Sequence, residues 1–262
     1  MCGRFTLSVD GGVLAALFGL VDAAPWAPRY NIAPCQNLLG IRNEIVQGQP
    51  VREAAPLRWG LVPRWAKDTR GASMMINARS ETARTKPAFG SLVKTRRCLV
   101  PADGFYEWKT EAGIKKPFWF SYPDRKPFVF AALWDSYTPP PGNSNYALKD
   151  SHSTFPLETC TILTTQSQGW LTSFHERMPV ILEEEDWSNW LDNSRSIDSI
   201  WDRVVGAFPG KGMVPFAVST RVNRVSEEGP GLLEAFGASP EPVAIRKTPK
   251  KRTEIDQPGL FD

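Results

Sequence analysis

Histidine is scarce in this sequence of 262 residues, and its cysteines are not clustered. Two histidines, His152 and His175, accompany four cysteines that lie far apart and form no CxxC pair, so no spacing typical of a zinc site is present. No apolar run is long enough to span a bilayer, and the start of the chain lacks the basic and apolar regions of a secretory signal. We therefore expect no metal, no cofactor, no membrane partner and a reduced, cytoplasmic compartment.

A strong excess of one charge is also absent, since 31 basic and 28 acidic residues give a net charge of +3. Residues 246–262 hold five of the basic and three of the acidic residues, which leaves 26 basic and 25 acidic residues elsewhere. A body with a net charge of only +1 excludes indiscriminate electrostatic binding to nucleic acid as the main mode of action. Any nucleic acid must therefore bind in a local groove.

Aromatic and β-branched runs fill the middle of the chain. Residues 98–110, 117–123 and 127–137 are three such runs separated by turn-like segments, which is typical of successive antiparallel strands. We expect further strands over 29–34, 38–43, 55–65 and 158–165, and helices over 8–20, 183–192 and 196–207. Residues 139–156 have the composition of a long surface loop that holds His152. The pattern predicts one α+β domain over residues 2–237, followed by a flexible basic tail over residues 238–262.

The opening residues, MCGRF, place a cysteine directly after the initiator methionine. If Met1 is removed, Cys2 carries a free α-amine and a thiol on adjacent carbons, which no internal cysteine does. Taken alone, the motif has a simpler interpretation, because position 2 could merely tolerate any small residue.

Five further stretches accompany it: RYNIAP (29–34), WGLVPRW (59–65), MMINARSET (74–82), PADGFYEWK (101–109) and SFHERMPVIL (173–182). Together, and in this order, the six motifs resemble those of the SRAP (SOS response-associated peptidase) family of abasic-site processing proteins. The resemblance extends from Cys2 to about Asn223. It implies a single SRAP-type domain over residues 2–237, built on a mainly antiparallel, barrel-like β-sheet with flanking helices.

The resemblance also implies an activity in the DNA damage response: capture of abasic sites in single-stranded DNA as a covalent cross-link, with a protective role against strand cleavage. It implies Cys2 as the nucleophile, with Asn77, Glu107 and His175 at the reaction centre. The candidate DNA contacts are Arg4, Asn31, Pro34, Trp65, Arg79 and Arg177. The expected protein is a monomer that works in the cytoplasm, at the nucleoid and its replication forks.

Elementary chemistry agrees with the choice of Cys2. An α-amine with a pKa of ~7.7–8.0 is neutral in about a fifth to a third of molecules near pH 7.4, against roughly a thousandth for lysine. Its imine with a sugar aldehyde can be trapped by the adjacent thiol as a five-membered thiazolidine. Burial and the aromatic neighbours Tyr106 and Trp108 are expected to raise the pKa of Glu107 so that it shuttles protons. His175 is expected to donate a proton and Asn77 to orient the reacting groups.

Each of these residues also has a structural interpretation. Glu107 alone resembles a surface carboxylate, and each arginine could form an internal ion pair. Trp65 could stack on a base or could pack in the core of a chain that holds ten tryptophans. Asn77, Arg79 and Glu81 would share one face if their segment is extended.

Two other functions remain open from the sequence. One is a thiol peptidase with Cys2 as its nucleophile, in the narrow form an auto-peptidase that only removes Met1; the other is a non-covalent module for single-stranded DNA. The terminal QPGLF resembles the short peptides by which bacterial repair proteins bind the sliding clamp, with Gln257, Leu260 and Phe261 as its contacts. A solvated tail is the alternative.

Overall fold

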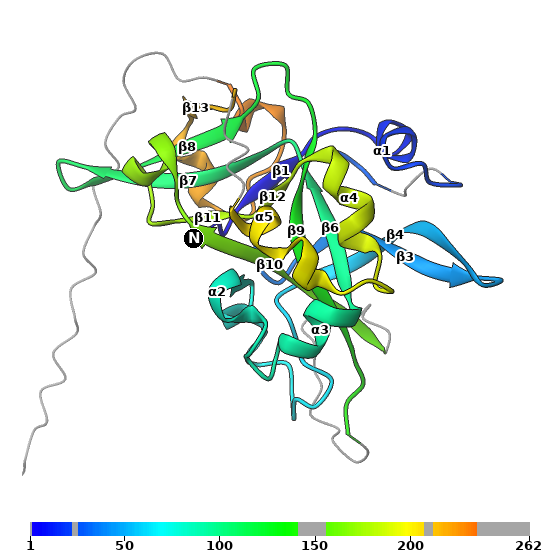
Figure 1. Ribbon diagram of the computed structural model, residues 1–262. Helices are drawn as coiled ribbons and strands as arrows, with labels where there is room; N and C mark the ends of the chain where they lie inside the picture. The colour runs from blue at the N-terminus through cyan, green and yellow to red at the C-terminus, as the bar shows by residue number, and fades with distance from the viewer. Residues whose placement is uncertain (1, 23–25, 141–155, 207–211, 235–262) are drawn as a thin grey trace, which may run out of the picture.

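The computed structural model describes residues 2–22, 26–140, 156–206 and 212–234 (Figure 1). The predicted clamp-binding residues Gln257, Leu260 and Phe261 lie outside the described residues, as does His152. Among the described residues, no helix has both the length and the apolar character that a membrane crossing requires.

Two β-sheets form the body of the protein (Figure 1). The first has the strand order β13-β8-β7-β1-β2, and the second the order β11-β10-β4-β3-β6-β9-β12, with β5 paired to β10. The strands are β1 (Phe5–Leu7), β2 (Arg29–Ile32), β3 (Asn37–Val46), β4 (Gln49–Trp59), β5 (Asn77–Arg79), β6 (Arg97–Ala102), β7 (Gly104–Glu111), β8 (Ile114–Ser121), β9 (Phe128–Tyr137), β10 (Leu157–Gln166), β11 (Arg177–Pro179), β12 (Ile181–Leu182) and β13 (Val214–Ala217).

The second sheet closes into a ring of pairings. Strand β10 pairs with both β4 and β9, while β4, β3, β6 and β9 pair with one another in turn. Strand β10 runs parallel to β4 and β5, and the other pairings of the described strands are antiparallel. The prediction of an α+β fold with mainly antiparallel sheets is confirmed, and this ring lies where a barrel-like sheet was expected.

The helices are short and flank the sheets (Figure 1). They are α1 (Gly11–Phe18), α2 (Ser80–Ala83), α3 (Gly90–Thr95), α4 (Glu184–Leu191) and α5 (Trp201–Gly206), with 3-10 helices η1 (Ala72–Met74), η2 (Gly169–Ser173), η3 (Ile197–Ser199), η4 (Thr220–Asn223) and η5 (Pro230–Leu232). The helix expected over 8–20 is trimmed at both ends, because Asp10 caps its first turn and Gly19 takes a left-handed conformation. The helix expected over 196–207 is divided into η3 and α5.

The run expected as one strand over 98–110 is two strands, and the break between them joins the two sheets. Strand β6 belongs to the second sheet and β7 to the first. Asp103 lies at the break, where its carboxylate accepts hydrogen bonds from the hydroxyl and backbone N–H of Ser8 and from the hydroxyl of Thr6. Gly104 follows against the Trp119 indole, where a Cβ would lie 2.1 Å from Nε1. This crossing directs the chain toward Glu107.

Strand β4 ends at Trp59, six residues before the predicted end at Trp65. Gly60 follows with a φ of 127°, and a Cβ there would lie 2.6 Å from the carbonyl oxygen of Ala72. Only glycine accommodates both the left-handed conformation and the close approach. The segment after Gly60 therefore leaves the sheet and packs against residues that lead into β5.

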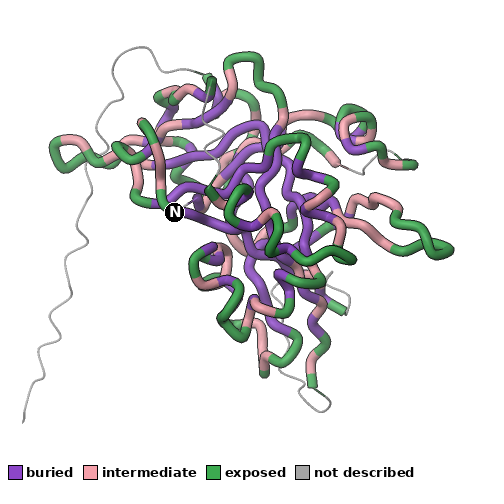
Figure 2. Tube along the Cα trace, in the orientation of Figure 1, coloured by how far each residue is buried: buried purple, intermediate pink, exposed green. Residues whose placement is uncertain are grey.

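Buried segments concentrate where the two sheets meet (Figure 2). Phe5 on β1 makes edge-on contacts with Trp59 and Phe130, which ties the first sheet to the second. The tryptophan-rich core was expected, and its buried members are Trp59, Trp119, Trp187, Trp190 and Trp201. Trp65 differs, because 64% of it is exposed.

Candidate active site and DNA contacts

Cys2 lies in the main core, immediately before β1, and is completely buried. Its Sγ is 4.0 Å from the carbonyl oxygen of Arg4. Burial raises the pKa of the Cys2 thiol far above its usual value, and the negative charge of Glu107 acts in the same direction. Burial and the charge of Glu107 thus both favour the neutral thiol, and Glu107 is close enough to act on it.

Asn77 begins β5, beside Ile162 of β10. Its side-chain Nδ2 donates a hydrogen bond of 2.9 Å to the carbonyl oxygen of Cys2. Its Oδ1 is buried and has no hydrogen-bond partner among the residues that the structure describes. The Nδ2 of Asn77 thus fixes the start of the chain, and its Oδ1 remains an acceptor that a ligand could use.

Glu107 lies on β7 and is 5% exposed. Burial raises its pKa above the usual carboxyl value, while the positive charges of the chain's amino terminus and of Lys115 act in the opposite direction. The predicted rise is confirmed, but Tyr106 and Trp108 are not its cause. Because side chains alternate along a strand, those two rings pack with each other in a separate cluster, whereas Phe105 joins the main core.

His175 lies between η2 and β11, with its ring half-buried. Its Nδ1 accepts a hydrogen bond of 2.9 Å from the backbone N–H of Arg177. A neutral ring held in this way carries its proton on Nε2, so the second nitrogen is a donor. The four predicted catalytic residues therefore come together from the chain start, β5, β7 and the segment before β11.

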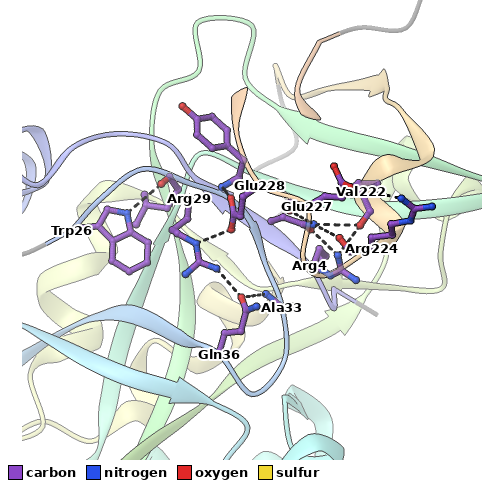
Figure 3. A network of polar contacts seen from close by, with 12 residues as sticks. Arg4, Trp26, Arg29, Ala33, Gln36, Val222, Arg224, Glu227 and Glu228 are labelled. Atoms are coloured by element: carbon purple, nitrogen blue, oxygen red, sulfur yellow. Dashed lines mark hydrogen bonds and ion pairs between the residues drawn. The ribbon is translucent and has the colours of Figure 1, made fainter. Parts of the chain in front are cut away.

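Arg4 and Asn31 form a polar network with the main chain of residues 222–227. Figure 3 shows the Arg4 side of this network next to Val222, Arg224 and Glu227. Arg4 Nη1 donates to Asn31 Oδ1 at 2.7 Å and to the carbonyl oxygen of Val222 at 2.8 Å. Asn31 is completely buried, and its Nδ2 donates to the carbonyl oxygens of Arg224 and Glu227 at 3.0 and 2.9 Å, with a longer bond to that of Val222. We call Arg4, Asn31 and the carbonyls of residues 222–227 the anchor network. The predicted DNA contact of Asn31 is not accessible in this arrangement.

Two of the predicted DNA contacts are open to solvent. Arg79 is exposed at the end of β5. Trp65 is exposed on a segment that is fixed at Arg64, whose backbone N–H and Nη2 donate to the buried carboxylate of Asp135 at 3.0 and 3.1 Å. Pro34 is half-buried. Asp135 was not predicted, because its partner is 71 residues away and no local pattern identifies it.

Arg177 is 8% exposed and forms an internal ion pair with Glu81. The expectation that Asn77, Arg79 and Glu81 share a strand face is wrong for Glu81, because β5 ends at Arg79 and α2 begins at Ser80. The helical turn directs Glu81 toward Arg177 instead.

A groove of about 1250 Å³ opens beside Glu81, bounded by α2, α3, α5 and the end of β10.

Comparison with known proteins gives the family. The family model described as SOS response associated peptidase (SRAP) matches residues 1–225, and the chain belongs to this family. The abasic site processing protein YoqW of Bacillus subtilis is 36% identical over 239 residues, which cover 90% of this chain and 100% of the relative. The abasic site processing protein HMCES of Gallus gallus is 30% identical over an alignment of 272 positions, which covers 89% of this chain and 77% of the relative.

Solved structures support the same fold. A protein from Bacteroides thetaiotaomicron superposes with a TM-score of 0.73 at 22% identity, over 90% of this chain and 100% of that structure. A protein from Bordetella bronchiseptica gives a TM-score of 0.66 at 25% identity, over 83% of this chain and 100% of that structure.

Proposed function

We propose that this protein processes abasic sites in single-stranded DNA, and that it does so by forming a covalent thiazolidine cross-link on Cys2 after Met1 is removed. The observation that carries the proposal is the convergence of Asn77, Glu107 and His175 on Cys2 in a chain whose relatives are named abasic site processing proteins. Capture would shield the lesion from strand cleavage during the response to DNA damage.

The reaction balances without a cofactor. The α-amine of Cys2 adds to the C1′ aldehyde of the ring-opened sugar, and the resulting carbinolamine loses water to give an imine. The thiol sulfur then adds to the imine carbon, and its proton goes to the nitrogen, which closes the five-membered ring. One water leaves in total, and ring closure removes the imine through which β-elimination would cut the strand. Intramolecular attack favours closure, since effective molarities of about 10⁵ M or more are reached by well-oriented groups.

Proton transfer falls to Glu107 and His175 in this scheme. Glu107 accepts a proton from the amine and returns it to the departing hydroxyl, and a raised pKa suits both steps. The Nε2–H of His175 donates to the sugar oxygen when the ring opens, because Nδ1 is occupied by the N–H of Arg177. Asn77 holds the Cys2 carbonyl, and its Oδ1, which has no hydrogen-bond partner among the described residues, can accept from the amine or from a sugar hydroxyl.

DNA is held without reading its sequence in this proposal. Arg79 offers a fork of donors to a phosphate, and Trp65 offers an exposed ring on which a base beside the lesion can stack. The target nucleotide has no base edge to read, so single strands of any sequence are suitable substrates.

Intact mass spectrometry tests the proposal. The purified protein is incubated with a single-stranded oligonucleotide that holds one abasic site. We expect a heat-stable adduct whose mass is that of the Met1-free protein plus the oligonucleotide minus one water. Cys2→Ala should give no such adduct, and Cys2→Ser should give no heat-stable one. Cys35→Ala serves as the matched control and should react like the wild type. A wild-type-like adduct from Cys2→Ala would exclude this mechanism.

A thiol peptidase with Cys2 as its nucleophile is the second candidate, and the matched family model carries that activity in its description. Cleavage of an unrelated peptide that is lost in Cys2→Ala would favour the peptidase. Single-strand binding with no adduct in the wild type would favour a non-covalent module.

A further inference from the structure

His175 lies on the loop that joins β10 to β11. The backbone N–H of Ser167 donates to the carbonyl oxygen of Glu176 at 2.9 Å, which closes the loop where the two strands end. Both strands belong to the second sheet, whereas Glu107 lies on β7 of the first sheet. The separation of His175 and Glu107 therefore depends on how this loop packs against the first sheet.

The hydrogen bond to the His175 ring does not fix that separation. Its Nδ1 accepts from the backbone N–H of Arg177, only two residues further on, so the bond orients the ring relative to its own loop. A fixed distance to a strand of the other sheet needs a contact of longer range.

Phe174 supplies such a contact. Its ring lies edge-on to those of Phe118 and Phe120 on β8, and the ring centroids are 5.0 Å apart in both pairs. Trp170, from the same loop, stacks on Phe120 at 5.5 Å and lies edge-on to Phe174 at 6.2 Å. Edge-on and stacked arrangements of this kind are the favoured geometries of aromatic pairs. We call Phe118, Phe120, Trp170 and Phe174 the aromatic dock, which fastens the loop to the first sheet.

The aromatic dock adjoins Glu107. Phe118 is the cross-strand partner of Glu107 in the pairing of β7 with β8, so the two side chains lie on the same face of the sheet. Lys109 follows on that face, and its Nζ lies 5.4 Å from the centroid of the Phe174 ring. Phe174 thus contacts the direct neighbour of Glu107, and His175 is the next residue along the chain.

We infer that Phe174 is a positioning residue for cross-link formation: its ring, held in the aromatic dock, keeps His175 at a working distance from Glu107. The inference rests on the proposed function, in which the Nε2–H of His175 donates to the sugar oxygen. A misplacement of about 1 Å can cost a reaction roughly 10²-fold in rate. Phe174 itself needs no contact with the DNA, since it acts through the residue that follows it.

Single-turnover cross-linking over a range of protein concentrations tests the inference. Phe174→Ala should lower the limiting rate by roughly ten- to a hundred-fold, because the loop loses its contact with β8. The protein concentration that gives half of the limiting rate should change by less than about two-fold, because other residues hold the DNA. Phe216→Ala is the matched control: it removes another half-buried phenylalanine, which packs on Trp119 in a separate cluster, and it should react like the wild type.

Two further variants separate positioning from packing. Phe174→Leu keeps most of the apolar volume but loses the edge-on contacts, so it should fold and should lower the limiting rate by about three- to ten-fold. In the background of His175→Gln, Phe174→Ala should cost less than about a further two-fold, because no imidazole remains to be positioned.

Four results would overturn the inference. They are a folded Phe174→Leu that reacts at the wild-type rate, an equal loss from Phe216→Ala, a full further loss in the His175→Gln background, and a change confined to the half-saturating concentration. The last of these would make Phe174 a DNA contact.

A measurement without DNA keeps this inference apart from the proposed function. Diethyl pyrocarbonate modifies histidine, and peptide mass spectrometry measures the rate at the half-buried His175 against His152 as the internal reference. Phe174→Ala should be modified at His175 about three-fold faster or more, because the loop is released. An unchanged rate overturns the inference. If modification accelerates but the wild type forms no adduct with abasic DNA, the proposed function is refuted and the docking of the loop stands.

Discussion

The anchor network and the candidate reaction site, which consists of Cys2, Asn77, Glu107 and His175, are both polar and largely buried, yet they differ in how their polar groups are satisfied. In the anchor network, the Asn31 amide donates to main-chain carbonyls and accepts from Arg4. In the reaction site, the Oδ1 of Asn77 has no partner among the described residues, and burial raises the pKa of both Cys2 and Glu107. The hydrogen bonds of the Asn31 amide are made within the protein, whereas the Asn77 amide keeps an acceptor that a ligand could use.

The difference has a thermodynamic meaning. A buried polar group with all its partners stabilises the fold, whereas one that is incompletely satisfied costs free energy. The anchor network fastens residues 222–227 to β2 and is expected to contribute stability. The reaction site is expected to reduce stability in exchange for reactivity. Substitutions in the two regions should therefore have opposite effects on stability and on cross-linking.

Glu107→Gln should give the largest effect. Gln has nearly the same shape but cannot transfer a proton, so cross-link formation at pH 7 should slow by roughly 10²- to 10⁴-fold. Denaturing gels of the adduct over time measure the rate. Glu111→Gln, on the exposed end of the same strand, is the control and should react at the wild-type rate. A Glu107→Gln protein that cross-links at the normal rate would remove Glu107 from the mechanism.

Asn31→Ala tests the anchor network. It leaves the main-chain carbonyls of residues 224 and 227 without their partner and removes one of the two acceptors of Arg4 Nη1, so the free energy of unfolding should fall by about 2–4 kcal/mol. Urea denaturation measures the loss, and Asn37→Ala, at an exposed position, should change it by less than about 0.5 kcal/mol. The folded variant should still form the cross-link at low temperature. Loss of cross-linking at unchanged stability would instead make Asn31 a DNA contact.

Trp65→Ala should affect binding alone. The ring is exposed, so its removal should change the free energy of unfolding by less than about 0.5 kcal/mol. If it stacks on a base, affinity for single-stranded DNA should fall by about 1–3 kcal/mol. Fluorescence anisotropy measures the affinity, and Ile45→Ala is the control because it removes another exposed apolar side chain, near the end of β3. Equal affinities for the two variants would leave Trp65 without a role in binding.

The sequence was sufficient for the fold class and for the residues that gather around Cys2. The antiparallel pattern followed from apolar runs separated by turn-like segments, and the four candidate catalytic residues followed from motif resemblance. Partners distant in the chain could not be predicted: Glu81 and Arg177 are 96 residues apart, and Arg4 and Val222 are 218 apart. The face of Glu81 was predicted wrongly because a strand gave way to a helical turn within one motif. Whether an arginine is buried depends on partners that are distant in the sequence, and a local sequence pattern does not show those partners.

The smallest expected effect concerns the pH dependence of stability. The pKa of Glu107 is raised in the folded protein, so the folded state binds its proton more tightly than the unfolded chain, whose carboxyl titrates near pH ~4.3. Wild-type stability from this group is therefore present below that pH and is lost as the pH rises through the folded pKa. Glu107→Gln does not titrate, so at neutral pH it should be more stable than the wild type, by about 1.4 kcal/mol for each unit of the rise.

Urea denaturation of both proteins between pH 4 and pH 8 measures this difference, which should be smallest at the acidic end and should level off once the pH exceeds the folded pKa. Glu111 supplies a control of opposite sign, since its hydrogen bond with Lys116 lowers its pKa. The stability due to Glu111 is present above its unfolded pKa and is lost on acidification, so Glu111→Gln should be slightly less stable at neutral pH. A Glu107→Gln protein that is less stable than the wild type at pH 8 would mean that Glu107 stabilises the fold, as Asn31 is expected to do, and the contrast between the two regions would be lost.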